Sequence, residues 1–164
     1  MSAKLSLFVL VVVSVLLALL LDVYPLPLEY RLLRPQFTLL IVIYWIFILP
    51  QSASLLAVLI LGILQDMIMG TPLGQHPLML LPVTWLCLRS YRRVRHFSRW
   101  QEMLWVWILV SVALLVGYWV QGLAGVNFSG FDLLLPGLTS AMIWPLLALL
   151  LDALRRRYRI SRQV

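Results

Sequence analysis

Charged residues are scarce in this chain. Only 12% of its 164 residues are charged, whereas 63% are hydrophobic and the mean hydropathy is +0.99. A soluble globular domain carries about 25% charged residues, so this sequence has too little charge to cover a surface exposed to water. The composition therefore predicts an integral membrane protein that forms a single transmembrane domain over residues 1–164.

Cysteine is almost absent, and the sets of residues that carry catalysis are incomplete. The single Cys87 excludes a disulfide framework and a metal site built on cysteine. His76 and His96 are expected on opposite sides of the membrane, so they cannot share a metal. Asp66 with His76 could form an acid–base pair, but no nucleophile or oxyanion site accompanies them. The sequence therefore predicts no enzymatic activity and no cofactor.

Acidic residues are few, and the basic ones are unevenly placed. Six acidic residues stand against thirteen basic ones, which gives a net charge of +7. Ten of the thirteen lie in the windows 89–99 and 155–162, and each window follows an apolar run. Such clusters mark the cytoplasmic side and attract anionic headgroups. They favour membrane lipid over nucleic acid as a partner and predict a cytoplasmic C-terminus, and six spans would place the N-terminus in the cytoplasm as well.

Six apolar segments are separated by turn residues. No small-residue cleavage site follows the first one, so it indicates an uncleaved helix rather than a signal peptide. The charge distribution alone also fits five spans, but a single helix over 36–69 would be about 51 Å long, too long for one span. We therefore expect an all-α bundle of six transmembrane helices, several of them short. The predicted helices cover about 5–23, 36–50, 53–69, 77–90, 103–123 and 133–153.

Several polar or small residues have simple packing interpretations. Tyr44 and Trp45 lie in the middle of a predicted helix, which favours packing over anchoring at the membrane interface. Ser14-x-x-x-Ala18 is a small-residue pair of the kind found at helix–helix contacts. Asp152 precedes Arg155 by three residues, a spacing typical of a surface ion pair.

An ordered series of motifs occupies the first half of the chain. The series comprises Arg34-Pro35, Tyr44-Trp45, Pro50, Gly62-x-x-x-Asp66, Gly70-Thr71-x-Leu73-Gly74 and His76. It resembles the pattern of the rod shape-determining protein MreD family. The sequence departs from that pattern at Gln36, at Gln51-Ser52 and at Thr71.

The resemblance implies a non-enzymatic scaffold subunit of the bacterial cell-elongation machinery, a multi-pass protein of the inner membrane. It implies binding to MreC, and through MreC a link to MreB, RodA, a penicillin-binding transpeptidase, peptidoglycan synthesis and cell shape. It also implies a fold like that of the substrate-binding subunits of energy-coupling-factor transporters. The alternative is a small-molecule-binding subunit of a transporter, for which the chain offers only scattered polar residues: Gln65, Gln75, Gln121 and Asn127.

The candidate structural or partner-binding residues are Arg34, Pro35, Asp66, Gly70, Gly74 and His76. Proline favours the first turn of a helix, so Pro35 is expected to start the helix at 36–50. A carboxylate inside the membrane and near a helix C-terminus is costly and needs a partner or a role. We expect the helices at 36–50 and 53–69 to pack antiparallel and to pair Arg34 with Asp66. In the alternative, each residue meets lipid headgroups or water independently.

Overall fold

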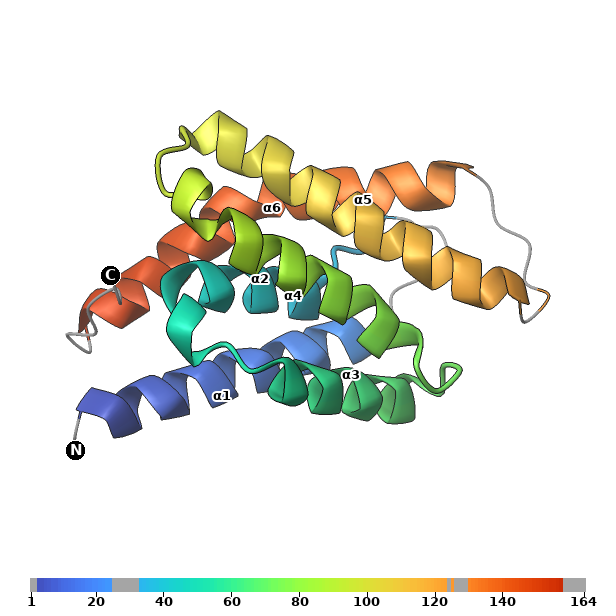
Figure 1. The fold of residues 1–164 in the computed structure, drawn as a ribbon, viewed down its shortest axis with the longest axis horizontal. Coiled ribbons are helices and arrows are strands. Elements are labelled where there is room, and N and C mark those ends of the chain that lie inside the picture. The colour runs from blue at the N-terminus through green and yellow to red at the C-terminus, as the bar shows by residue number, and fades with distance from the viewer. Residues whose placement is uncertain (1–2, 25–32, 124, 126–129, 158–164) are drawn as a thin grey trace.

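Six α-helices make up most of the described part of the chain (Figure 1). The structure is a computed structural model, and it describes residues 3–24, 33–123, 125 and 130–157. The helices are α1 (Ala3–Val23), α2 (Phe37–Ile48), α3 (Leu55–Met69), α4 (Gln75–Val94), α5 (Arg99–Leu123) and α6 (Gly130–Arg157), and a short 3-10 helix, η2 (Pro50–Ser52), joins α2 to α3. The predicted all-α fold with six helices is confirmed.

The helices differ in length and in polarity. Within the described residues, α1, α5 and α6 are long and apolar enough to cross a membrane. The apolar helices α2 and α3 have 12 and 15 residues and are short as predicted, whereas α4, predicted over 77–90, has 20 residues. At 12 residues α2 is about 18 Å long, well below the ~30 Å hydrocarbon core of a bilayer. Ten of those 12 residues are buried, so α2 is enclosed by protein rather than by lipid.

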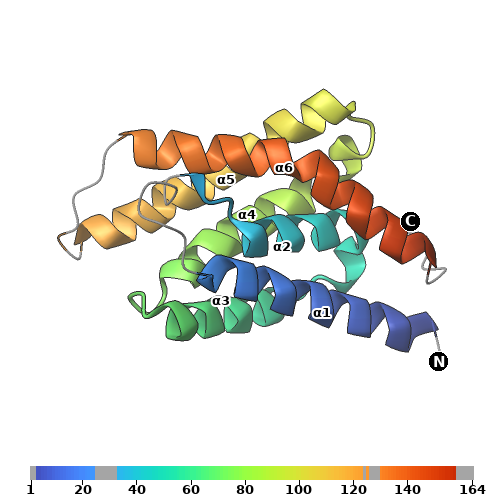
Figure 2. The same ribbon diagram turned by 180° about the vertical axis from the view of Figure 1, so that it is seen from behind.

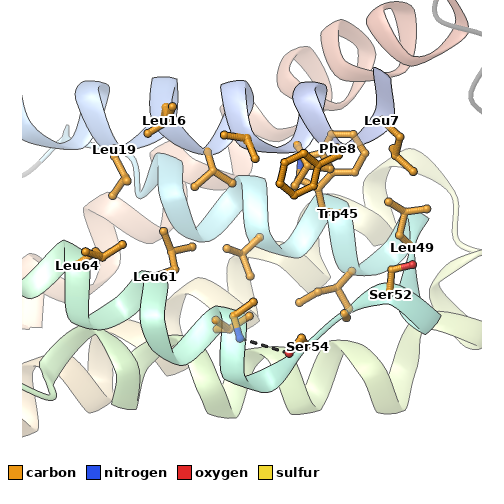
Figure 3. A pocket seen from close by; sticks show the side chains of 18 residues that line it. Leu7, Phe8, Leu16, Leu19, Trp45, Leu49, Ser52, Ser54, Leu61 and Leu64 are labelled. Atoms are coloured by element: carbon orange, nitrogen blue, oxygen red, sulfur yellow. Dashed lines mark hydrogen bonds between the residues drawn. The ribbon is translucent and has the colours of Figure 1, made fainter. Parts of the chain in front are cut away.

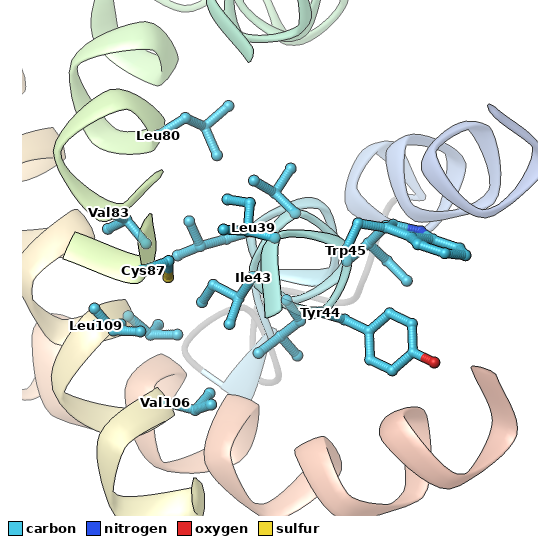
Figure 4. Close-up of a cluster of buried hydrophobic side chains, with 14 of the residues drawn as sticks. Leu39, Ile43, Tyr44, Trp45, Leu80, Val83, Cys87, Val106 and Leu109 are labelled. Carbon is cyan, nitrogen blue, oxygen red and sulfur yellow. The ribbon is translucent and has the colours of Figure 1, made fainter. Parts of the chain in front are cut away.

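The core is built around α2 (Figure 4). Leu39 and Ile43 of α2 face Val83 of α4, and Leu109 of α5 completes the cluster. On its other sides α2 packs against α1 and, to a smaller extent, α6. The main neighbour of α3 is α4, and α3 also touches α1. The expected antiparallel packing of α2 on α3 is therefore wrong, because α3 lies against α4 instead.

Tyr44 and Trp45 attach α2 to its two outer neighbours, as their mid-helix position indicated. Both side chains are buried, with Trp45 directed toward α1 and Tyr44 toward α6 (Figure 4). The indole N–H of Trp45 donates to Ser14 Oγ at 2.8 Å, so Ser14 does lie at a helix–helix contact. The Tyr44 hydroxyl donates to Asp152 Oδ1 at 2.9 Å. Asp152 also pairs with Arg155 at 3.1 Å, so the predicted ion pair forms. Its expected place on the surface is wrong, because Arg155 is buried.

The two ends of the bundle carry different residues. The start of α1, the α4–α5 turn and the end of α6 lie at one end of the bundle (Figure 1). This end, called the basic end below, holds the arginines of window 89–99 and also Arg155, Arg156 and Arg157, while the rest of the second window lies outside the described residues. The opposite end holds the α3–α4 turn and the start of α6, and α6 changes direction along its course (Figure 2).

Candidate functional site

Asp66 is the centre of a closed hydrogen-bond cluster between α3 and α4. Its side chain is buried, and it accepts hydrogen bonds from the Thr71 hydroxyl at 2.9 Å and from the backbone N–H groups of Gly74 and His76 at 2.7 and 3.0 Å. The Nδ1 atom of His76 lies 2.6 Å from Asp66 Oδ1. We call Asp66, Gly70, Thr71, Gly74 and His76 the Asp66 joint.

Two glycines give the chain the turn that the Asp66 joint needs. Gly70 ends α3 with φ +65° and Gly74 precedes α4 with φ +99°, a conformation that favours glycine at both positions. The turn brings the first N–H groups of α4 onto the Asp66 carboxylate. This carboxylate therefore sits at the positive end of α4, which offsets the unfavourable dipole at the end of α3.

Gly62 lies one helical turn before Asp66 and faces the same helix. A Cβ atom at position 62 would lie 2.6 Å from the backbone nitrogen of Pro77, in the first turn of α4. Residues four apart share one face of a helix. Gly62 therefore lets α4 approach α3 closely, and Asp66 caps the N-terminus of α4.

The expected ion pair between Arg34 and Asp66 does not form. Arg34 Nη2 donates instead to the backbone carbonyls of Leu21 and Tyr24, both at 3.1 Å. The reason is the packing of the helices, because the end of α3 meets the start of α4 and not the segment that precedes α2. Arg34 therefore satisfies carbonyl groups at the C-terminal end of α1, where a cation is favoured.

Asp22 is a site residue that the sequence did not single out. Its carboxylate accepts from the backbone N–H groups of Phe37 and Thr38 at 3.0 and 2.8 Å, at the start of α2. The N–H of Gln36 donates to Ser140 Oγ of α6 at 3.0 Å. We call Asp22, Arg34, Ser140 and the start of α2 the Asp22 joint.

The start of α2 explains why a distant cap is needed. The residue at its N-cap position is Gln36, and its side chain makes no capping hydrogen bond. The lack of Ser, Thr, Asp or Asn there is a sequence signal that the cap must come from elsewhere. Pro35 is buried but lies one residue before the N-cap, so it precedes the helix rather than occupying its first turn.

The two joints hold five of the six candidate residues, and the His76 contacts do not have the arrangement of a catalytic triad. Arg34 belongs to the Asp22 joint, and Pro35 lies directly before the N-cap residue of α2. Asp66, Gly70, Gly74 and His76 belong to the Asp66 joint. The hydroxyl of Thr71 and the carboxylate of Asp66 both lie at Nδ1 of His76, at 3.3 and 2.6 Å. A catalytic triad instead places its nucleophile and its acid on different imidazole nitrogens. Within the described residues, no group of three His, Cys, Asp or Glu side chains could hold a metal ion.

An apolar groove runs between α1 and α3, with α2 as its floor (Figure 3). It has a volume of about 530 Å³, and only Trp45, Ser52 and Ser54 among its lining residues carry polar side-chain atoms. The indole N–H of Trp45 is bonded to Ser14, and Ser54 Oγ accepts from the N–H of Ala57 at 3.3 Å. Gln65 and Gln75 are buried elsewhere, Gln121 does not line the groove, and Asn127 lies outside the described residues.

Comparison with known proteins places the chain in a family. A family model described as rod shape-determining protein MreD matches residues 2–154. The rod shape-determining protein MreD of Haemophilus influenzae is 27% identical over 144 residues, which cover 88% of this chain and 89% of that protein. No solved structure matches the chain, so the expected likeness to energy-coupling-factor subunits is not supported. The family match extends over nearly the whole sequence and confirms the resemblance, so the chain belongs to the MreD family of rod shape-determining membrane proteins.

Proposed function

We propose that this chain is a non-enzymatic scaffold of the rod-shape complex in the bacterial inner membrane. In this proposal it binds the transmembrane helix of MreC and thereby supports peptidoglycan synthesis by the elongation machinery, which includes MreB, RodA and a penicillin-binding transpeptidase. Membership of the MreD family supports a role in cell shape. The observation that carries the proposed partner contact is the apolar groove between α1 and α3.

The groove suits a helix with an apolar surface. Its wall α1 is the least covered of the three long helices, with 22% of its most apolar window buried against 33% and 39% for α5 and α6. Helices associate in lipid through close packing rather than through a hydrophobic driving force, and small residues permit that approach. Ala53 and Ala57 provide small residues at the end of the groove near η2.

The groove does not suit a polar small molecule. Binding pockets for such ligands combine an apolar lining with several polar groups placed to fix the ligand. The indole N–H of Trp45 is already bonded within the protein, and Ser54 Oγ caps α3. Among the described residues, the groove therefore offers no set of polar groups that would support the transporter alternative for a polar ligand.

Filling the groove tests the proposed contact. Ala57→Trp places a bulky side chain in the groove, and Leu146→Trp places the same side chain on the exposed side of α6, outside the groove. Each variant replaces the wild-type protein in cells, and MreC is measured after purification in detergent. We expect Ala57→Trp to lose MreC and to widen the cells, and Leu146→Trp to do neither. Retention of MreC by Ala57→Trp, or equal loss in both variants, would contradict the proposal.

We further propose six spans with the basic end in the cytoplasm. The clustering of arginine at that end supports this orientation. Single cysteines at Ser2, Leu73 and Val164, in a Cys87→Ser background, can be labelled in spheroplasts with an impermeant reagent, and Leu73 is exposed in the α3–α4 turn. We expect labelling at position 73 and protection at positions 2 and 164. Labelling at position 2 would contradict six spans, and labelling at position 164 would contradict the orientation.

A further inference from the structure

The hairpin of α4 and α5 presents an arginine-rich surface at the basic end. Arg89, Arg92 and Arg93 are exposed, and their spacing of three and four residues places them on one face of α4. Arg95 in the turn and Arg99 at the start of α5 are also exposed and extend this surface. We call these five arginines the hairpin arginines.

Few carboxylates balance this charge. Among the described residues, Glu102 pairs with Arg99 at 3.5 Å and Asp152 pairs with Arg155 at 3.1 Å. No described carboxylate lies within ion-pair distance of the side chains of Arg89, Arg93 or Arg95. Like charges three or four residues apart destabilise a helix, so an anion bound across this face would relieve their repulsion.

The chemistry of the hairpin arginines favours a phosphate group. A guanidinium presents forked N–H donors that match two phosphate oxygens at once, which a lysine ammonium cannot do. Arg92 is held in place by its neighbour, because its Nε donates to the Tyr91 hydroxyl at 3.0 Å and its guanidinium lies 5.8 Å from the Tyr91 ring centroid.

The surrounding residues place the hairpin arginines at the depth of lipid headgroups. Trp85 is one turn before Arg89 and Trp100 follows Arg99, and their exposed fractions are 59% and 78%. Tryptophan concentrates at the boundary between lipid and water. Further along α5, the exposed residues Leu104 and Ile108 are apolar, as hydrocarbon requires. Phosphate at this depth belongs to membrane lipid rather than to a soluble protein partner.

We propose that the hairpin arginines form a binding site for the phosphodiester headgroup of an anionic phospholipid. This site lies on α4 and α5, apart from the groove of α1, α2 and α3, and it does not depend on the proposed function. It also goes beyond a general preference of basic residues for the cytoplasmic side, because it assigns lipid binding to one hairpin and not to the end of α6, where Arg156 and Arg157 are also exposed.

Lipid retention by the purified full chain tests the proposal. The protein in a neutral detergent is mixed with equal amounts of phosphatidylglycerol and phosphatidylcholine of the same acyl chains, and bound lipid is counted by native mass spectrometry. We expect preferential retention of phosphatidylglycerol by the wild-type protein. Arg89→Gln with Arg93→Gln should lower that retention about tenfold or more.

Matched variants separate a specific site from overall charge. Arg156→Gln with Arg157→Gln removes two exposed arginines from the same end of the molecule and should lower retention by less than about threefold. Arg89→Lys with Arg93→Lys keeps the charge but loses the forked donors, so it should bind at an intermediate level. Equal loss in the two glutamine variants, or equal retention of the two lipids by the wild-type protein, would overturn the proposal. Displacement of the lipid by millimolar inorganic phosphate would do the same, because it would indicate a site for free phosphate.

Discussion

The Asp22 joint and the Asp66 joint connect successive helices by the same chemistry. They differ in how far apart along the chain their residues lie. In each, a carboxylate in the last turns of one helix accepts hydrogen bonds from the first N–H groups of the next helix. The Asp66 joint is local, since all of its residues fall within 66–76. The Asp22 joint needs Arg34 and also Ser140 from α6. A short joint is therefore specified by a motif, whereas a long one is specified by the packing of three helices.

Removing the Asp66 carboxylate should have the largest effect on stability. Asp66→Ala leaves the N–H groups of Gly74 and His76 and the imidazole of His76 without their buried acceptor. We expect a loss of about 3–5 kcal/mol in the free energy of unfolding, measured by thermal and denaturant unfolding in detergent. Asp66→Asn should lose less, because one amide oxygen still accepts. If Asp66→Ala lowered the free energy of unfolding by less than Asp22→Ala, the prediction that the Asp66 joint contributes more to stability would be wrong.

Adding one methyl group to Gly62 should disturb the Asp66 joint by pushing the first turn of α4 away from α3. The new Cβ would meet the backbone of Pro77, which cannot move without shifting α4. We expect Gly62→Ala to cost about 1–3 kcal/mol. The control is Gly117→Ala, where the new Cβ would lie equally close, at 2.6 Å, to the flexible side chain of Met79. Equal losses in the two variants would show that close approach to a rigid backbone is not the cause.

Removing the carboxylate of the Asp22 joint should cost less than removing that of Asp66. Asp22→Ala deprives Phe37 and Thr38 of a cap, but the N–H of Gln36 keeps its bond to Ser140. We expect a loss of about 1–2 kcal/mol, the usual range for a lost helix cap. Ser140→Ala removes the remaining cap. Because the two caps serve the same helix end, the double variant should lose more than the sum of the two single losses.

The smallest expected effect is the coupling between the two joints. Arg34 bonds to carbonyls of α1 and Asp66 to groups of α4, so Arg34→Ala and Asp66→Ala should be additive within about 0.5 kcal/mol. A double-mutant cycle measured by unfolding in detergent checks this expectation. Coupling well above that value would restore the Arg34–Asp66 pair that the sequence suggested.

The sequence predicted those features that depend on composition and on neighbours along the chain. The six helices, the short α2 and α3 and a turn that begins at Gly70 follow from apolar runs and breaking residues, although α4 begins at Gln75 and not at residue 77. Asp66 was recognisable as a carboxylate that needs a partner. The cluster around it was not predicted, because a short connection at Pro50–Ser52 suggested that α2 packs on α3 and that Asp66 meets Arg34. Choosing between α2 and α4 as the neighbour of α3 requires knowing how closely backbones approach, which depends on contacts across the whole bundle.

The role of Asp22 could not be read from its own surroundings. It follows an apolar run, and the described backbone groups that donate to its carboxylate are the N–H groups of Phe37 and Thr38, 15 and 16 residues further along the chain. Only the missing cap at Gln36 pointed to a distant acceptor. A helix that begins without a local capping residue is thus a useful signal for tertiary capping in short membrane proteins.

The hydrogen bond between Trp45 and Ser14 has a mechanical consequence for α1. Together with Asp22, it fastens α1 to α2 at two points eight residues apart, or about 12 Å along the helix. A single contact would allow α1 to rotate about that point, whereas two contacts fix both the angle between α1 and α2 and the position of α1 along α2. The segment of α1 before Ser14 lies outside this clamped stretch and touches α2 and α3 through apolar side chains such as Leu7 and Val11. The α1 wall of the groove is therefore held to α2 by hydrogen bonds at Ser14 and at Asp22, and by apolar packing toward the basic end.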